Sequence, residues 1–131
     1  MKNLFLITVL LFTCFFYNCK EQKKSSNLQL ITSGEMEELL NLEDVQLVDV
    51  RTPSEFNAGH VPDAQNINFY DENFDQQIET LDKSKPIIVY CKSGGRSAKC
   101  ASKLVEKGFE KIYDLEGGFS QWKFKGLTIE Y

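Results

Sequence analysis

The residues best suited to chemistry lie in one short segment, Cys91 to Ser97, which reads CKSGGRS. A cysteine directly follows an apolar run, and two cations, Lys92 and Arg96, come within five residues of it. Cations and the free amides of a helix N-terminus both favour a thiolate over a thiol. A cysteine that merely ends a buried strand is the alternative, but the glycine-rich cationic surroundings favour a reactive group. We therefore predict that Cys91 is a thiolate nucleophile with a pKa well below the ordinary value of about 8.5.

The small residues of this segment suggest how an anion is held beside the sulfur. Ser93, Gly94 and Gly95 can adopt backbone conformations that are closed to bulkier residues, so that successive amides turn inward and form an anion-binding nest. The sequence predicts that the substrate-binding residues are Lys92, Ser93, Gly94, Gly95, Arg96 and Ser97.

The elements that position this segment alternate along the chain. Strands are expected at 28–31, 45–50, 66–69, 86–90 and 111–115. Helices are expected after Thr32, after Thr52, around 74–81, from about 98 to Gly108, and after Gly118. Strands that alternate with helices predict an α/β fold, with a mainly parallel sheet flanked by helices on both faces. In such a fold ligands bind at the carboxyl ends of the strands, and Cys91 follows the most apolar one.

Three separate stretches carry a family resemblance. They are 48–64 (VDVRTPSEFNAGHVPDA), 91–97, and 117–122 (GGFSQW) followed by Gly126-Leu127. The chain resembles a single-domain rhodanese, the thiosulfate sulfurtransferase family, from about residue 30 to residue 131. The resemblance implies that Cys91 takes sulfane sulfur from an anionic donor such as thiosulfate. A thiol or a cyanide-like acceptor then removes the sulfur from the Cys91 persulfide. Lys92, at a position where many relatives carry Arg, is expected to attract the donor.

The spacing of the segment separates the activities known for this fold. Four residues lie between Cys91 and Arg96, as in sulfurtransferases, whereas related phosphatases and arsenate reductases have five. Sulfur transfer is therefore favoured. A persulfide carrier that depends on a sulfur-relay partner protein is the main alternative, and a phosphatase or arsenate reductase is a lesser one.

Other residues are expected to support the site. Asp49 and Arg51 should pair beneath the reactive segment, and His60, the only histidine, should orient a loop. A lone histidine without neighbouring cysteines does not indicate a metal site, and no cofactor is expected. The net charge of −4 and the lack of a basic stripe argue against nucleic acid as a partner.

The N-terminal residues indicate a destination outside the cytoplasm. Lys2 precedes a stretch of fourteen uncharged residues, 4–17, which is too short to span a bilayer but fits an export signal. Cys19 and a polar run follow, as in bacterial lipoproteins. We predict a signal peptide (1–18), a lipidated Cys19 with a polar tether (19–27) and a rhodanese domain (28–131), held to a membrane by the lipid or free in the periplasm. Cys100 is expected to be buried and unpaired, because a helix would separate it from Cys91.

Overall fold

The computed structural model describes residues 27–42 and 44–131. The predicted signal peptide, Cys19 and nearly all of the tether lie outside the described residues. The strands are β1 (Leu28–Ile31), β2 (Gln46–Asp49), β3 (Gln65–Asn66), β4 (Ile87–Tyr90) and β5 (Ile112–Leu115). The helices are α2 (Ser33–Leu42), α3 (Pro53–Asn57), α4 (Phe74–Glu79), α5 (Gly95–Glu106) and α6 (Gly118–Phe124).

The strands form one sheet in the order β1-β5-β4-β2-β3, and every pairing in it is parallel. Strand β4 lies at the centre, between β5 and β2, and all of its residues are buried. This agrees with its continuous apolar sequence, which is typical of a strand that is covered on both faces. The predicted α/β fold with a parallel sheet is confirmed.

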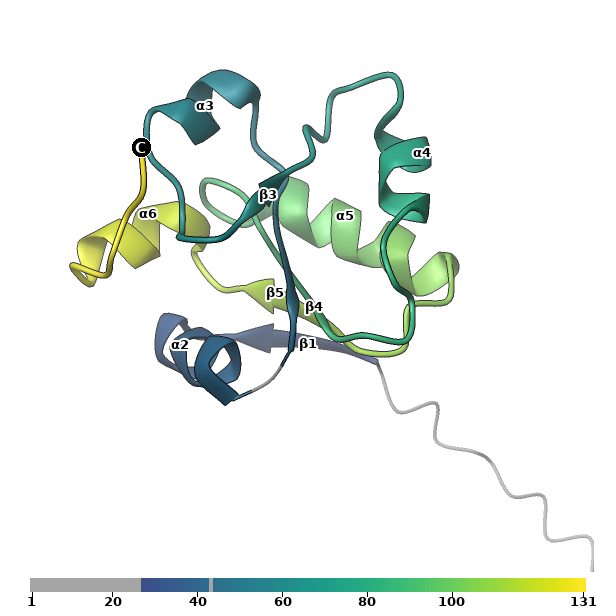
Figure 1. The fold of residues 1–131 in the computed structure, drawn as a ribbon, viewed down its shortest axis with the longest axis horizontal. Coiled ribbons are helices and arrows are strands. Elements are labelled where there is room, and N and C mark those ends of the chain that lie inside the picture. Colours follow the sequence, from purple (N-terminus) through teal and green to yellow (C-terminus); the bar gives the residue numbers. More distant parts are fainter. Residues whose placement is uncertain (1–26, 43) are drawn as a thin grey trace, which may run out of the picture.

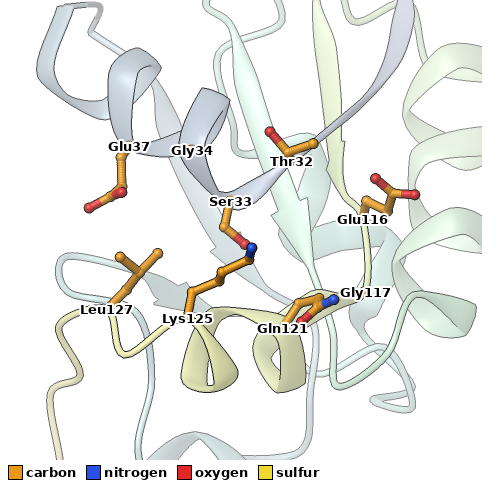
Figure 2. A pocket seen from close by; sticks show the side chains of 9 residues that line it. All are labelled: Thr32, Ser33, Gly34, Glu37, Glu116, Gly117, Gln121, Lys125 and Leu127. Atoms are coloured by element: carbon orange, nitrogen blue, oxygen red, sulfur yellow. The ribbon is translucent and has the colours of Figure 1, made fainter.

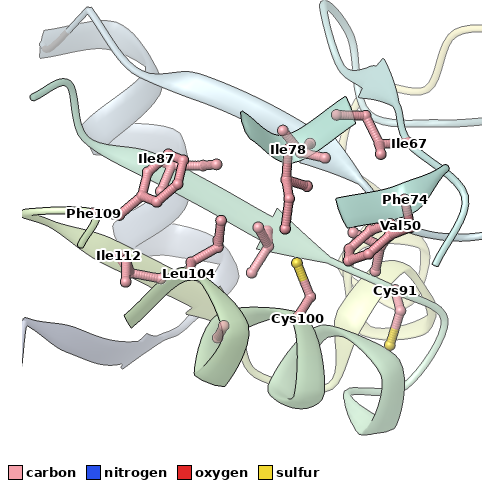
Figure 3. Packing of buried hydrophobic residues seen from close by; sticks show 13 residues of the cluster. Val50, Ile67, Phe74, Ile78, Ile87, Cys91, Cys100, Leu104, Phe109 and Ile112 are labelled. Atoms are coloured by element: carbon pink, nitrogen blue, oxygen red, sulfur yellow. The ribbon is translucent and has the colours of Figure 1, made fainter. Parts of the chain in front are cut away.

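Helices cover both faces of the sheet (Figure 1). Side chains alternate along β4: Ile87 and Val89 pack under α4 and α5, whereas Ile88 and Tyr90 pack against α2 and α6. The same alternation places Cys91 on the α5 face, in the core cluster shown in Figure 3. None of the helices in the described ranges combines the length and apolar character that crossing a bilayer requires.

Local signals fix several helix ends. Thr32 and Glu35 form a capping box at the start of the helix that is predicted after Thr32, in which the Glu35 amide donates to Thr32 Oγ1 and the Thr32 amide donates to Glu35 Oε2. Thr52 and Glu55 form a second one at the start of α3. Gly108, with φ +86°, follows the end of α5, where a left-handed backbone favours glycine.

The expected strand at 66–69 is wrong in extent, because β3 spans only Gln65–Asn66. The Asn66 side-chain amide donates to the carbonyl oxygens of Asp49 and Arg51, at 3.0 and 2.9 Å. The Arg51 carbonyl oxygen thus accepts a hydrogen bond from a side chain, whereas in a longer strand it could have accepted one from the backbone. The pattern of apolar residues did not reveal this.

Candidate active site

Cys91 directly follows strand β4 and therefore lies at the carboxyl edge of the sheet, near the start of α5. We call residues 91–96 the thiol loop. Cys91 is 1% exposed, whereas Lys92, Ser93 and Gly95 are exposed. Gly94 has φ +116°, a conformation open to glycine, and its amide donates to Cys91 Sγ at 3.1 Å. The thiol loop therefore has the predicted turn, with backbone amides directed at the sulfur.

Opposing effects act on the Cys91 thiol. Burial by itself would raise its pKa, since it disfavours the charged form. The Ser97 hydroxyl and the backbone amides of Ser97, Gly94 and Ser93 outweigh this effect by hydrogen-bonding the sulfur, so the pKa lies below its usual value. This is the direction that the sequence predicts. The Ser97 side chain is fully buried, with Oγ 3.5 Å from Cys91 Sγ.

Helix α6 holds the thiol loop through two backbone hydrogen bonds. The Phe119 amide donates to the Cys91 carbonyl at 2.8 Å, and the Ser120 amide donates to the Lys92 carbonyl at 3.0 Å. These amides are among the free donors of the first turn of α6. Gly118, with φ +56°, makes the approach possible: a Cβ there would lie 2.5 Å from the Cys91 carbonyl oxygen. This role of Gly118 was not predicted from the sequence, although paired glycines between a strand and a helix are a signal of close backbone approach.

Arg96 is paired with Glu55 of α3. Its guanidinium donates to both carboxylate oxygens of Glu55, at 2.7 and 2.9 Å, and holds the pKa of Glu55 at about 2. The exposed Tyr70 ring lies on its other side, with its centroid 5.7 Å from Arg96 Cζ. Arg96 therefore ties the thiol loop to α3, and its predicted contact with substrate stays a prediction. Glu55 and Tyr70 were not identified from the sequence, because they lie 41 and 26 residues from Arg96.

Asp49 and Arg51 form the expected pair, with Arg51 Nη2 2.6 Å from Asp49 Oδ2 and both side chains buried. The pair does not lie beside the sulfur. It lies on the α6 face of the sheet, where Arg51 Cζ is 4.1 Å from the centroid of the Phe119 ring. Because Phe119 also hydrogen-bonds the Cys91 carbonyl, the pair supports the thiol loop through α6.

The other predicted residues lie apart from the thiol. His60 Nδ1 is 3.0 Å from the Phe56 carbonyl and its ring stacks on Phe56, as expected of a residue that orients a loop. Cys100 is buried and free. Figure 3 shows its sulfur among apolar side chains while that of Cys91 points elsewhere, and burial raises the Cys100 pKa to about 12. Within the described residues, no group of three His, Cys, Asp or Glu side chains is placed to hold a metal.

A hollow of about 840 Å³ lies away from the thiol, between the start of α2 and α6 (Figure 2). Ser33, Glu37, Glu116 and Lys125 are among the residues that line it, and Cys91 is not. Two carboxylates beside one ammonium do not favour a small sulfur anion. The reactive chemistry of the described residues therefore centres on the thiol loop.

Comparisons with known proteins point to one family. The family model for a rhodanese-like domain matches residues 32–125. Thiosulfate sulfurtransferase GlpE of Shewanella oneidensis is 35% identical over 97 residues, which are 74% of this chain and 94% of that protein. A sulfurtransferase of Allochromatium vinosum is 34% identical over 91 residues, covering 70% and 83% of the two chains. Among solved structures, a rhodanese-related protein of Thermoplasma volcanium matches with a TM-score of 0.70 and 26% identity, covering 78% and 97% of the chains. The polysulfide-sulfur transferase homodimer of Wolinella succinogenes matches with a TM-score of 0.67 and 29% identity, covering 79% of each.

Proposed function

This chain belongs to the rhodanese family and is a sulfurtransferase, and we propose that it works through a persulfide on Cys91, with thiosulfate as the donor. The observation that carries the proposal is the Cys91 sulfur itself. It is buried at the end of β4, accepts a hydrogen bond from the Gly94 amide and donates one to Ser97 Oγ, in a loop with four residues between Cys91 and Arg96. A preorganised set of donors around a sulfur can stabilise an anionic sulfur.

In the first step the Cys91 thiolate attacks the outer sulfur of thiosulfate. A new S–S bond forms, the S–S bond of thiosulfate breaks, and sulfite leaves with the electron pair. The product is a Cys91 persulfide anion, whose terminal sulfur lies within reach of the thiol-loop amides. In the second step a nucleophile such as cyanide or a thiolate attacks that terminal sulfur and releases the Cys91 thiolate. Lys92, exposed at the rim, supplies a positive charge for the incoming anion.

The test measures thiocyanate formed from thiosulfate and cyanide. The Cys91→Ala variant should lose this activity, whereas Cys100→Ala, with its thiol in the core, should retain it. Intact mass after incubation with thiosulfate alone should rise by about 32 Da, one sulfur atom, only when Cys91 is present. Thiocyanate production that survives the loss of Cys91 would refute the proposal.

The donor can be distinguished in the same assay. The structural relative from Wolinella succinogenes is named for polysulfide-sulfur transfer, so polysulfide is the second donor to compare. The rim Lys92 supports an anionic donor in either case, and the ratio of kcat/KM for the two donors decides between them. An aryl phosphate should not be hydrolysed, because Glu55 holds the Arg96 guanidinium that would have to bind a phosphate.

We propose a sulfur-relay protein as the acceptor in the cell. The support is access: only the rim residues of the thiol loop are exposed, so an acceptor must reach a persulfide that projects from a buried residue. The proposal predicts that the enzyme forms the Cys91 persulfide, detected as an added sulfur, but transfers this sulfur only slowly to small free thiols. Fast turnover with small thiols contradicts it.

We also propose that the enzyme is exported and anchored by a lipid on Cys19. The support is the sequence pattern alone, a short apolar segment followed by a cysteine and a polar run ahead of the matched residues. Mass spectrometry of protein purified from native membranes tests it. An acylated Cys19 at the mature N-terminus is expected, and a chain that starts at Met1 without lipid refutes it. Cys19→Ser should release the protein from the membrane fraction.

A further inference from the structure

A buried carboxyl group lies behind the thiol loop and takes no part in the steps described so far. Asp114 is 6% exposed and occupies the third position of β5, in register with Leu30 of β1 and Val89 of β4. Its neighbours Tyr113 and Leu115 belong to the core cluster on the α6 face. Because side chains alternate along a strand, the Asp114 carboxyl points to the α5 face, the side that holds the Cys91 sulfur.

This carboxyl lacks the partners that a buried acid needs. Its Oδ1 is fully buried and has no hydrogen-bond partner among the described residues. The Ser97 hydroxyl, on the first turn of α5, interacts with the carboxyl and partly offsets the effect of burial on its pKa. A buried ionised carboxylate without a counter-ion is costly, so this one stands out as a group that requires an explanation.

Ser97 connects the carboxyl to the reactive sulfur. The Cys91 thiol donates to Ser97 Oγ at 3.5 Å, and Ser97 Oγ is within 3.3 Å of the Gly94 carbonyl oxygen, to which it can donate and which competes with Asp114 for the hydroxyl hydrogen. A hydroxyl has one hydrogen to donate. If the Asp114 carboxyl is ionised, it attracts that hydrogen, and Ser97 offers the sulfur only a lone pair. If the carboxyl is protonated, it can donate to Ser97 Oγ, and the hydroxyl hydrogen is free for a sulfur anion.

We propose that Asp114 is a positioning residue that sets, through the Ser97 hydroxyl, how well the site holds an anionic sulfur on Cys91. While the pair holds one proton, that proton can lie on either group: the S–H bond breaks as Ser97 accepts the thiol proton, Ser97 passes its own proton on, and an O–H bond forms on the Asp114 carboxylate, so the buried charge stays constant. At higher pH this last proton is lost to solvent. The thiol and the carboxyl thus share one proton and titrate as a pair. The consequence for a persulfide rests on the proposed function, whereas the pairing with the thiol does not.

The surroundings agree with a shared proton. Burial raises the pKa of Asp114, and the hydrogen bonds described above lower that of Cys91, so the two values move towards each other. The Cys100 thiol of α5 also interacts with the carboxyl, and its own pKa is raised. The Lys103 ammonium of α5 acts on Cys100 and is bound by Asp75. Strand β1, with the sequence LQLI, contributes no titratable group.

The first experiment measures the pH dependence of Cys91 alkylation in the full chain. Asp114→Asn keeps the shape, can donate to Ser97 Oγ, and cannot carry a charge. The alkylation midpoint should move by about one pH unit towards lower pH, because the variant removes the carboxylate whose negative charge opposes ionisation of the thiol. An unchanged midpoint, or a higher one, overturns the proposal. Far-UV circular dichroism and urea unfolding establish that the variant is folded.

A double-mutant cycle tests the route through Ser97. In a Ser97→Ala background, the shift caused by Asp114→Asn should fall to less than half. An equal shift in both backgrounds would mean that the carboxylate acts directly through space, which overturns the positioning role.

A third measurement does not require a substitution of Asp114. In the unmutated protein, the ¹³C resonance of the Asp114 carboxyl should titrate in two steps, the upper one at the Cys91 alkylation midpoint. Cys91→Ala should remove the upper step. A single step in the unmutated protein overturns the proposal even if Asp114→Asn fails to fold. None of these measurements involves sulfur transfer, so a failure of the proposed function is detected separately by the thiocyanate assay.

Discussion

Gly118 is the residue through which α6 sets the position of the thiol loop, and its replacement by alanine provides a quantitative test. Two costs can be separated. The first is backbone strain: with φ +56°, a residue with a Cβ costs about 1–2 kcal/mol in the left-handed region. The second is steric, since the Cβ would lie 2.5 Å from the Cys91 carbonyl oxygen and 2.8 Å from the Lys92 carbonyl carbon. Both of these atoms belong to backbone, so the thiol loop itself must move.

A matched control lies at the other end of the same helix. Gly126 has φ +72°, but a Cβ there meets nothing within 4 Å, so Gly126→Ala carries the strain without the clash. Gly126→Ala should lower the free energy of unfolding by about 1–2 kcal/mol and leave thiocyanate formation unchanged. Gly118→Ala should lose about 2–5 kcal/mol, because overpacking adds about 1–3 kcal/mol to the strain.

The effect on activity follows from displacement of the nucleophile. A misplacement of about 1 Å can cost about a hundredfold in rate, so kcat for Gly118→Ala should fall between about tenfold and a hundredfold. Urea unfolding measures the stability of both variants, and the thiocyanate assay under conditions where each is folded measures the activity. If the two variants lose the same stability and both retain full activity, the proposed role of α6 in positioning the thiol loop is wrong.

Three further predictions concern the charged and sulfur-containing side chains. Glu55→Gln should cost about 1–2 kcal/mol at pH 7, once partial exposure is discounted. The carboxyl has a pKa of 4.5 when unperturbed and about 2 when folded, so in urea unfolding the difference from the unmutated protein should shrink as pH falls from 4.5 to 2; a constant difference contradicts the ion pair. Iodoacetamide at neutral pH should modify Cys91 and spare Cys100 in the native protein, but modify both in urea; mass spectrometry of the peptides reads this out, and native labelling of Cys100 contradicts its placement in the core. Arg51→Met should cost about 3–5 kcal/mol in urea unfolding because it leaves a charged Asp49 buried without its partner, and a loss below about 1 kcal/mol contradicts that account.

The parts of the site that could be predicted from the sequence are the local ones. The β-branched run that ends at Tyr90 indicates a buried central strand, and the residues that follow it supply the glycine turn and the helix start. Since the amides that lower the Cys91 pKa come from within six residues of the sulfur, their effect can be anticipated from spacing alone. The four-residue distance to Arg96 is likewise a property of the sequence.

The parts that sequence reasoning missed depend on contacts between distant elements. Glu55 reads locally as the second half of a capping box, and it does serve there, but its carboxylate also binds an arginine 41 residues away. Asp114 is one polar residue in a short strand, and only the sheet order and register place it behind the thiol loop. The short extent of β3 goes with a hydrogen bond from the Asn66 side chain to the Arg51 carbonyl, which the spacing of apolar residues does not predict.

The thiol loop also shows how hydrogen bonds can favour ionisation of a buried thiol. Arg96 is paired with Glu55, and the hydrogen bonds that lower the Cys91 pKa come from the Ser97 hydroxyl and from the backbone amides of Ser97, Gly94 and Ser93. Peptide groups can do this only if their orientation is fixed in advance, because an amide that is free to rotate gives up part of its interaction when charge appears. Here the amides face the sulfur on one side, while the Cys91 and Lys92 carbonyls on the other side are held by the first amides of α6. A flip of either peptide plane would break a hydrogen bond to α6 as well as change the surroundings of the sulfur. The peptide dipoles are therefore oriented when the protein folds and not when the thiol ionises. Glycine at position 94 allows the turn of the thiol loop, and glycine at position 118 allows the backbone of α6 to lie close to it.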